Sequence, residues 1–163
     1  MMCDFFLYRG CVTIMTMKCS FCTLPEIKNR TVAKNDLAFA FLTYIPIVPG
    51  HVLISPARCV AKFGDLSDEE VAAIFELRAK LEKALIKTFS AEGFNYAWNE
   101  GKAGGQSVSH FHLHMIPRKE GDKGIYKYEP REFLYRSESS ESRPVTPEEE
   151  LLDVAKLIRE AAE

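Results

Sequence analysis

The sequence predicts an α+β fold: an antiparallel sheet with one long helix and one C-terminal helix. The first observation is a series of short aromatic and β-branched runs, mostly joined by turns that contain Gly or Pro. The second is a pair of segments whose apolar residues recur at helical spacing, one in mid-chain and one at the end. Strands, then a helix, then more strands fit an antiparallel sheet better than a parallel, doubly wound one.

Four strands are predicted. The first run, 37–48, ends at a Pro-Gly turn, and a second short strand follows over 51–55. A third strand is predicted over 94–98. A glycine-rich turn at 101–105 then precedes the fourth strand, at 108–116.

The long helix is predicted over 68–91. Ser67 and Glu70 form a capping box at its start, and apolar residues follow on one helical face. Gly93 is expected to end this helix because glycine commonly follows the last helical turn.

The C-terminal helix is predicted to start at Thr146, after a polar loop at 119–145. Pro147 is expected at its first helical position, and Glu149 completes a second capping box. One apolar face is expected, formed by Leu151, Val154, Leu157 and Ile158. Residues 119–163 are therefore read as a C-terminal loop and helix extension.

Length and composition exclude several classes of protein. A chain of 163 residues fits one domain, and 47% hydrophobic with 27% charged residues excludes wholesale disorder, collagen-like repeats and a membrane bundle. The 21 basic and 23 acidic side chains leave a net charge of −2, which disfavours nucleic-acid polymers as partners. No run approaches the roughly 18 apolar residues that cross a bilayer, so no membrane association is expected.

The cysteines and the N-terminal residues bear on location. Five cysteines form an odd set, and residues 1–17 lack the basic, apolar and small-residue layout of an export signal. A reducing, cytoplasmic compartment is therefore expected. Residues 1–17 are read as an N-terminal extension, and we expect Met15 or Met17 to be the natural start, with residues 1–14 an over-extended gene model.

The most informative pattern is a row of histidines at alternate positions. His110, His112 and His114 would share one face of a strand, because successive side chains on a strand point to opposite faces. Backbone N–H groups of the adjacent Gly105–Ser107 turn would favour an anion such as phosphate in the same place. Two alternatives stay open at this point: a solvent-facing polar strand face, and a zinc-binding histidine cluster.

The motif His110-Phe-His-Leu-His-Met-Ile, preceded by Gly105-Gln106-Ser107, resembles the signature of the histidine-triad (HIT) nucleotide hydrolases and transferases. Further matches lie upstream in the same order: Cys19-Ser-Phe-Cys22, Pro49-Gly50-His51, Asp65-Leu-Ser-Asp-Glu-Glu and Asn99-Glu-Gly101. The resemblance assigns residues 18–118 to the HIT domain. Within the family, the Pro-Gly-His segment and the C-terminal extension favour a resemblance to the fragile-histidine-triad branch, which acts on dinucleoside polyphosphates.

The resemblance implies a catalytic role for each triad histidine. His112 would be the nucleophile that attacks the α-phosphorus and forms a nucleotidyl-histidine, which water then hydrolyses. His114 would contact the phosphate and stabilise charge on its oxygens, and His110 would orient His112 or bind a metal. Substrate contacts are implied for Gly105, Gln106, Ser107 and Asn99, although Asn99 alone also fits a plain turn residue.

A structural zinc is also implied by the resemblance. In the branch with an N-terminal Cys-x-x-Cys, two cysteines, a later histidine and the first triad histidine hold zinc. Cys19, Cys22 and His110 match that pattern, whereas Cys59 stands where the family has the later histidine. A Cys3His set is a sound tetrahedral zinc site with no open position for a catalytic water. Free buried thiols without a metal are the alternative.

Other residues near the motif carry weaker expectations. Thr43 stands where the family places Asp or Asn against the ribose, so ribose discrimination is in question. Phe39 and Phe41 fit either a nucleobase pocket or ordinary core. His51 is expected to be structural, with a hydrogen-bonding role near the site.

The leading hypothesis is a nucleotide hydrolase that cleaves at the α-phosphorus, with diadenosine polyphosphates or related nucleotide conjugates as substrates and Mg²⁺ accompanying the polyphosphate. A transferase or phosphorylase with the same nucleophile, a zinc-stabilised nucleotide-binding protein and a metallohydrolase are the alternatives. The resemblance also implies a homodimer.

Overall fold

The computed structural model describes residues 19–122 and 145–163. A five-stranded sheet in the order β1-β2-β3-β5-β4 forms its centre, and every neighbouring pair of strands is antiparallel. In chain order the elements are α1 (Ser20–Thr23), α2 (Pro25–Asn29), β1 (Thr31–Lys34), β2 (Ala38–Leu42), β3 (Val52–Pro56), η1 (Phe63–Asp65), α3 (Asp68–Phe89), β4 (Gly93–Ala97), η2 (Lys102–Gly104), β5 (Leu113–Arg118) and α5 (Glu148–Ala161). The predicted α+β antiparallel fold with one long and one C-terminal helix is confirmed.

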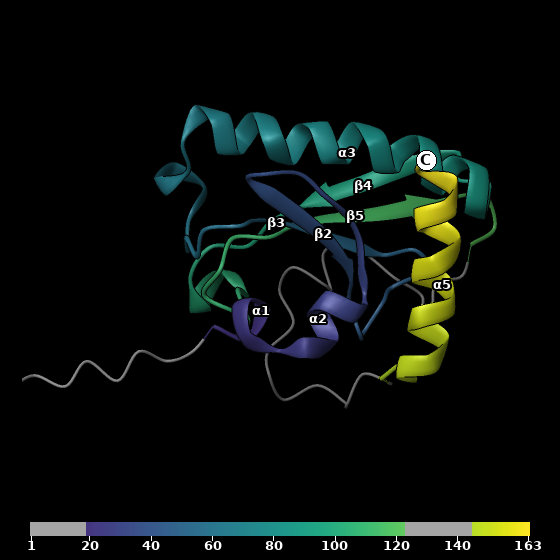
Figure 1. Ribbon diagram of the computed structural model, residues 1–163, viewed down its shortest axis with the longest axis horizontal. Coiled ribbons are helices and arrows are strands. Elements are labelled where there is room, and N and C mark those ends of the chain that lie inside the picture. The colour runs from purple at the N-terminus through teal and green to yellow at the C-terminus, as the bar shows by residue number, and fades with distance from the viewer. Residues whose placement is uncertain (1–18, 123–144) are drawn as a thin grey trace, which may run out of the picture.

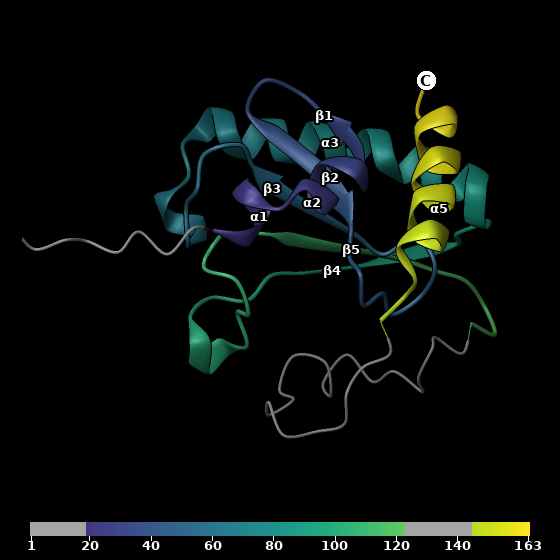
Figure 2. The same cartoon turned by 60° about the horizontal axis from the view of Figure 1, so that its bottom comes forward.

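The two faces of the sheet have different coverings. The long helix α3 lies along one face and α5 packs beside it, while α1 and α2 lie on the opposite side (Figures 1 and 2). Alternate residues of the strands separate accordingly: Leu42, Ile54 and Met115 join the main core under α3. Phe41 and Leu53 instead pack with Ile27 of α2. The α1–α2 side of the sheet is the one that carries the site.

The predicted capping box of α3 is confirmed. Ser67 Oγ accepts from the N–H of Glu70, and a Glu70 carboxylate oxygen accepts from the N–H of Ser67. The predicted end of this helix is wrong. Ser90 takes the left-handed conformation at φ 55° and closes α3 after Phe89, whereas Gly93 begins β4.

The predicted start of the C-terminal helix is corrected too. Pro147 precedes the first helical residue and no side chain caps α5, so the second capping box does not form. The N–H of Thr146 instead donates to the carbonyl of Tyr44. Leu151 and Ile158 are buried as expected, but Leu157 is 51% exposed.

Several strand predictions need correction. Of the run 37–48 only Ala38–Leu42 is a strand, and β1 at Thr31–Lys34, a short edge strand, was not predicted. The last predicted strand begins at Leu113 rather than 108. His110 and His112 therefore lie in the segment that leads into β5, and only His114 belongs to the strand.

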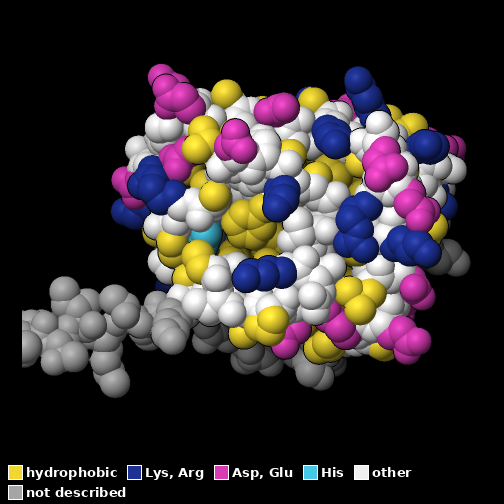
Figure 3. All heavy atoms as spheres, viewed as in Figure 1, with side chains coloured by type: hydrophobic (Ala, Val, Ile, Leu, Met, Phe, Trp, Pro, Cys, Tyr) yellow, Lys and Arg dark blue, Asp and Glu magenta, His cyan; other side chains and the backbone are white. Residues whose placement is uncertain are grey.

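The folded chain shows neither a strongly charged face in Figure 3 nor a membrane-spanning helix among its described residues, as its net charge of −2 and its hydropathy predict. Basic and acidic side chains lie interspersed on the face that carries α3 and α5 (Figure 3). Among the described helices, none has the length and apolarity needed to span a membrane. The predicted N-terminal extension 1–17, the start at Met15 or Met17, and most of the predicted loop 119–145 lie outside the described residues.

Candidate active site and metal centre

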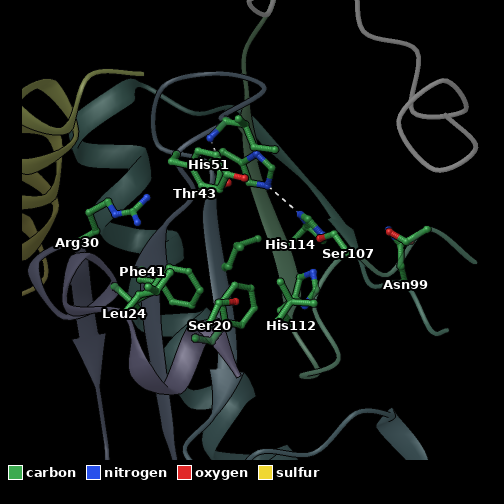
Figure 4. Close-up of a pocket in the computed structure, with 17 residues that line it drawn as sticks. Ser20, Leu24, Arg30, Phe41, Thr43, His51, Asn99, Ser107, His112 and His114 are labelled. Carbon is green, nitrogen blue, oxygen red and sulfur yellow. Dashed lines mark hydrogen bonds between the residues drawn. The ribbon is translucent and has the colours of Figure 1, made fainter. Parts of the chain in front are cut away.

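A cavity of about 490 Å³ opens on the α1–α2 side of the sheet (Figure 4). Its size is within the usual range for a small-molecule site. It brings together most of the predicted substrate and catalytic residues: Phe41, Thr43, Asn99, Gly105, Ser107, His112 and His114. His110 and Gln106 do not line it.

His112 has a defined hydrogen-bond geometry. Its Nδ1–H donates to the backbone carbonyl oxygen of His110 at 2.8 Å. The proton of the neutral ring is therefore on Nδ1, and Nε2 keeps its lone pair. Burial lowers the pKa of His112, although the hydrogen bond to the His110 carbonyl acts in the opposite direction. An unprotonated imidazole nitrogen at neutral pH is what a nucleophilic role requires.

His114 is held in the complementary tautomer by His51. The N–H of Ile47 donates to His51 Nδ1 at 3.2 Å, so the His51 proton is on Nε2. His51 Nε2–H then donates to His114 Nδ1 at 3.0 Å (dashed in Figure 4). The neutral His114 ring therefore carries its proton on Nε2. His112 and His114 are neighbours, with ring centroids 5.0 Å apart, and both line the cavity, so one ring offers an acceptor nitrogen and the other a donor nitrogen.

An apolar, aromatic wall of the cavity adjoins His112. Phe21 contacts both Phe41 and His112 edge-on, with ring centroids 5.0 and 5.3 Å away. Phe39 stacks on Phe41 from behind and does not line the cavity. The buried Thr43 accepts a hydrogen bond from the N–H of Ile45 with its hydroxyl oxygen. A flat heterocycle would fit this part of the cavity.

The side chain of Gln106 links the glycine-rich loop to the segment that follows β3. Gln106 Oε1 accepts from the N–H of Gly101 at 2.9 Å, and its Nε2 donates to the carbonyl of Ala61 at 2.8 Å. Both ends of the amide are therefore used, one within the loop and one on the segment after β3, and Gly105 and Ser107 line the cavity. Asn99 contributes a long hydrogen bond from its Nδ2 to the carbonyl of Gly105.

The predicted metal ligands meet next to this cavity. Ligand atoms of Cys19, Cys22, Cys59 and His110 all lie within 4.8 Å of one another. His110 Nε2–H donates to the carbonyl of Pro56 at 2.9 Å, so Nδ1 keeps its lone pair. That nitrogen lies 3.3 Å from Cys19 Sγ and 3.5 Å from Cys22 Sγ. The four groups could hold one metal ion.

The electrostatics of the cluster fit a cation. Burial, aided by the neighbouring Cys19, raises the pKa of Cys22 to about 12, and burial also raises the pKa of Cys59. Burial lowers the pKa of His110, which keeps its imidazole neutral. Packed thiols resist ionisation because each thiolate repels the next, and a divalent metal would remove that repulsion. The donor set, three sulfurs and one imidazole nitrogen, is of a kind that binds zinc.

Sequence patterns missed part of the cavity. Arg30, Leu24 and Tyr44 line it from the loops and short helices around β1, where no motif marks them. His51 was expected near the site without a stated partner, and the structure supplies one in His114.

A family model for the HIT domain matches residues 24–121. The chain belongs to the HIT family. A bis(5'-adenosyl)-triphosphatase of Dictyostelium discoideum is 36% identical over 123 residues, 69% of this chain and 83% of that protein. An adenosine 5'-monophosphoramidase of Schizosaccharomyces pombe is 33% identical over 135 residues, 82% of this chain and 90% of that protein.

Solved HIT structures agree with the fold. A Zn-bound histidine triad family protein from Mycobacterium smegmatis superposes with a TM-score of 0.65 at 25% identity, covering 90% of this chain and 94% of that one. The family and enzyme class predicted from the motifs, a histidine-triad nucleotide hydrolase, are thereby confirmed.

Proposed function

We propose that this HIT protein hydrolyses nucleotide conjugates at the α-phosphorus through a nucleotidyl intermediate on His112. The observation that carries the proposal is the Nδ1–H hydrogen bond from His112 to the His110 carbonyl, which leaves Nε2 as a lone-pair donor beside the cavity. Relatives named as a bis(5'-adenosyl)-triphosphatase and an adenosine 5'-monophosphoramidase support substrates with a phosphoanhydride or phosphoramidate bond at that phosphorus.

In the first step, His112 Nε2 attacks the α-phosphorus. A P–N bond forms, the bond from phosphorus to the leaving group breaks, and the leaving group departs with its electron pair. The Nδ1–H bond to the His110 carbonyl supports this step, because it stabilises the positive charge that develops on the ring. In the second step water attacks the same phosphorus and releases a proton to solvent, the P–N bond breaks with its electron pair returning to His112 Nε2, and a nucleoside monophosphate leaves.

His114 and the glycine-rich loop would stabilise charge on the phosphoryl oxygens. The tautomer set by His51 presents a donor at His114 Nε2, and the loop residues Gly105 and Ser107 line the same side of the cavity. Preorganised donors of this kind are usually the largest single contribution to catalysis of such transfers. Phe41 and Thr43 would contact the base and ribose.

The metal centre would hold one structural zinc. Cys19, Cys22, Cys59 and His110 supply four ligands, which leaves no open position for a reacting water. Zinc bound there would tie α1 and the segment after β3 to the histidine segment, so its effect on catalysis would pass through the placement of His112. The homodimer expected from the family, the Mg²⁺ expected with a polyphosphate substrate, and the cytoplasmic location expected from the cysteines and the N-terminal residues stay predictions.

Hydrolysis assays on matched substrates test the proposal. Purified protein is incubated with a diadenosine polyphosphate and with adenosine phosphoramidate, each with and without inorganic phosphate. We expect AMP release that His112→Ala lowers by at least about 10⁴-fold, whereas Lys28→Ala, on an exposed side chain of α2 outside the cavity, leaves it unchanged. Phosphate-dependent formation of ADP would favour a phosphorylase, and no product from any substrate would favour a nucleotide-binding protein.

A further inference from the structure

Arg30 lies at the opposite side of the cavity from the catalytic histidines. It follows α2, its side chain is only 5% exposed, and it lines the cavity. Figure 4 shows its guanidinium end directed toward the cavity, with the Phe41 ring on the side nearer His112. A buried cation is costly unless its donors are paired, so its partners decide what it does.

The hydrogen bonds of Arg30 are incomplete. Its Nε–H donates to the carbonyl of Glu26 at 3.2 Å. Nη1 is buried and has no hydrogen-bond partner among the described residues. A guanidinium carries five N–H donors in a planar fork and no acceptor, so the unmet requirement is for acceptor atoms.

Within residues 19–122 and 145–163, Arg30 has only a weak counter-charge. A carboxylate oxygen of Glu148 lies 3.5 Å from Nε, longer than a charge-assisted hydrogen bond, and the Glu148 side chain is 41% exposed. The ring of Tyr44 adds a cation–π contact, with its centroid 5.8 Å from the guanidinium carbon. Neither contact provides an acceptor for Nη1.

We infer that Arg30 reads the nucleobase and selects guanine over adenine. This inference rests on the proposed function, because a phosphate held at His112 and His114 would direct the base along the apolar wall toward Arg30. Guanine presents two adjacent acceptors, O6 and N7, to which an arginine fork donates in a bidentate pair. Adenine presents N7 beside an amino group, and that N–H donor faces the donors of Arg30.

Binding of nucleoside monophosphates tests the inference without any need for catalysis. Dissociation constants of GMP, IMP and AMP are measured by calorimetry on the full chain. We expect GMP to bind about 5- to 150-fold more tightly than AMP, the discrimination typical of one bidentate arginine–guanine pair. IMP keeps O6 and N7 but lacks the 2-amino group, so it should bind like GMP, and 7-deaza-GMP should lose part of the advantage.

Variants separate base reading from structure. Arg30→Met should weaken GMP binding, leave AMP binding within about threefold and so remove the preference, and Arg30→Lys should keep only part of it because lysine lacks the fork. Lys28→Met, in α2 two residues before Arg30 and outside the cavity, should retain the wild-type ratio. Glu148→Gln, which removes the ion pair, should retain it too.

The results that overturn the inference are distinct from failure of the proposed function. Wild-type protein that binds AMP as tightly as GMP would overturn it, and so would an Arg30→Met protein with an unchanged ratio. Should Arg30→Met fail to fold, the wild-type series of GMP, IMP, 7-deaza-GMP and AMP decides alone. A guanine preference without hydrolysis of diguanosine or diadenosine tetraphosphate would instead contradict the proposed function only.

Discussion

The hydrogen-bond chain from Ile47 through His51 to His114 predicts that two amide substitutions at His51 act in opposite ways. An asparagine amide reaches the place of imidazole Nδ1, so His51→Asn can still accept from the N–H of Ile47 but cannot donate to His114. A glutamine amide reaches the place of Nε2, so His51→Gln keeps the donor to His114 and loses the acceptor for Ile47.

The expected magnitudes follow from which buried group loses its partner. In His51→Gln the buried N–H of Ile47 is unsatisfied, which should cost about 1–3 kcal/mol of unfolding free energy with kcat close to wild type. In His51→Asn the His114 ring loses the partner that fixes its tautomer and orientation, and kcat should fall by roughly 10- to 100-fold.

Urea denaturation and steady-state kinetics on the same preparations measure the two effects. A kcat that falls more in His51→Gln than in His51→Asn would refute the assigned proton positions. Equal losses of stability and of kcat in both variants would show that His51 only fills space.

Three further outcomes are expected. Chelation, or the variant Cys59→Ser, should reduce the zinc content from about one ion per chain. Loss of even ~3 kcal/mol of metal-binding free energy would lower the Tm measured by calorimetry by about 6–12 °C. An unchanged Tm would count against the metal centre. Ile158→Ala, at a fully buried position of α5, should cost about 2–4 kcal/mol in urea denaturation, against under about 0.5 kcal/mol for the exposed neighbour Leu157→Ala; similar values would show that α5 is not docked as described. Hydrogen bonds from Arg58, and then from the N–H of Ser67, lower the pKa of Glu70 below 4.5. The stabilisation that ionised Glu70 gives the fold is therefore complete above about pH 4.5 and is lost as the pH falls through the pKa of Glu70 in the folded state. Glu70→Gln should flatten that part of a curve of unfolding free energy against pH, and an unaltered slope would contradict this.

Local sequence motifs predicted the fold best where the two residues that interact are close in the sequence. Ser67 and Glu70 are three residues apart and cap each other, so the start of α3 was predictable to the residue. The end of α3 was not, because the left-handed position is taken by Ser90 while Gly93 is used in β4. The edge strand β1 is four residues long and only Val32 in it is buried, which leaves too little periodicity to detect.

The motifs predicted the metal ligands, including the distant Cys59, but they did not predict the partners of Arg30 and His51. Cys59 lies close to Cys19, Cys22 and His110 although it departs from the family pattern. Alternate spacing predicted a strand through all three histidines, yet the side-chain roles diverge because His110 turns toward the thiols. The pairing of Arg30 with Glu148 of α5 depends on helix docking across the chain, which no local pattern encodes.

The most direct test of the central claim is to capture the intermediate on His112. Protein is mixed with a nucleotide conjugate labelled on its α-phosphate, quenched in milliseconds at alkaline pH, digested and mapped by mass spectrometry. One nucleoside monophosphate attached to His112 is the predicted result. Full turnover with no labelled residue, or the label on His114 or His110 instead, would contradict the assignment.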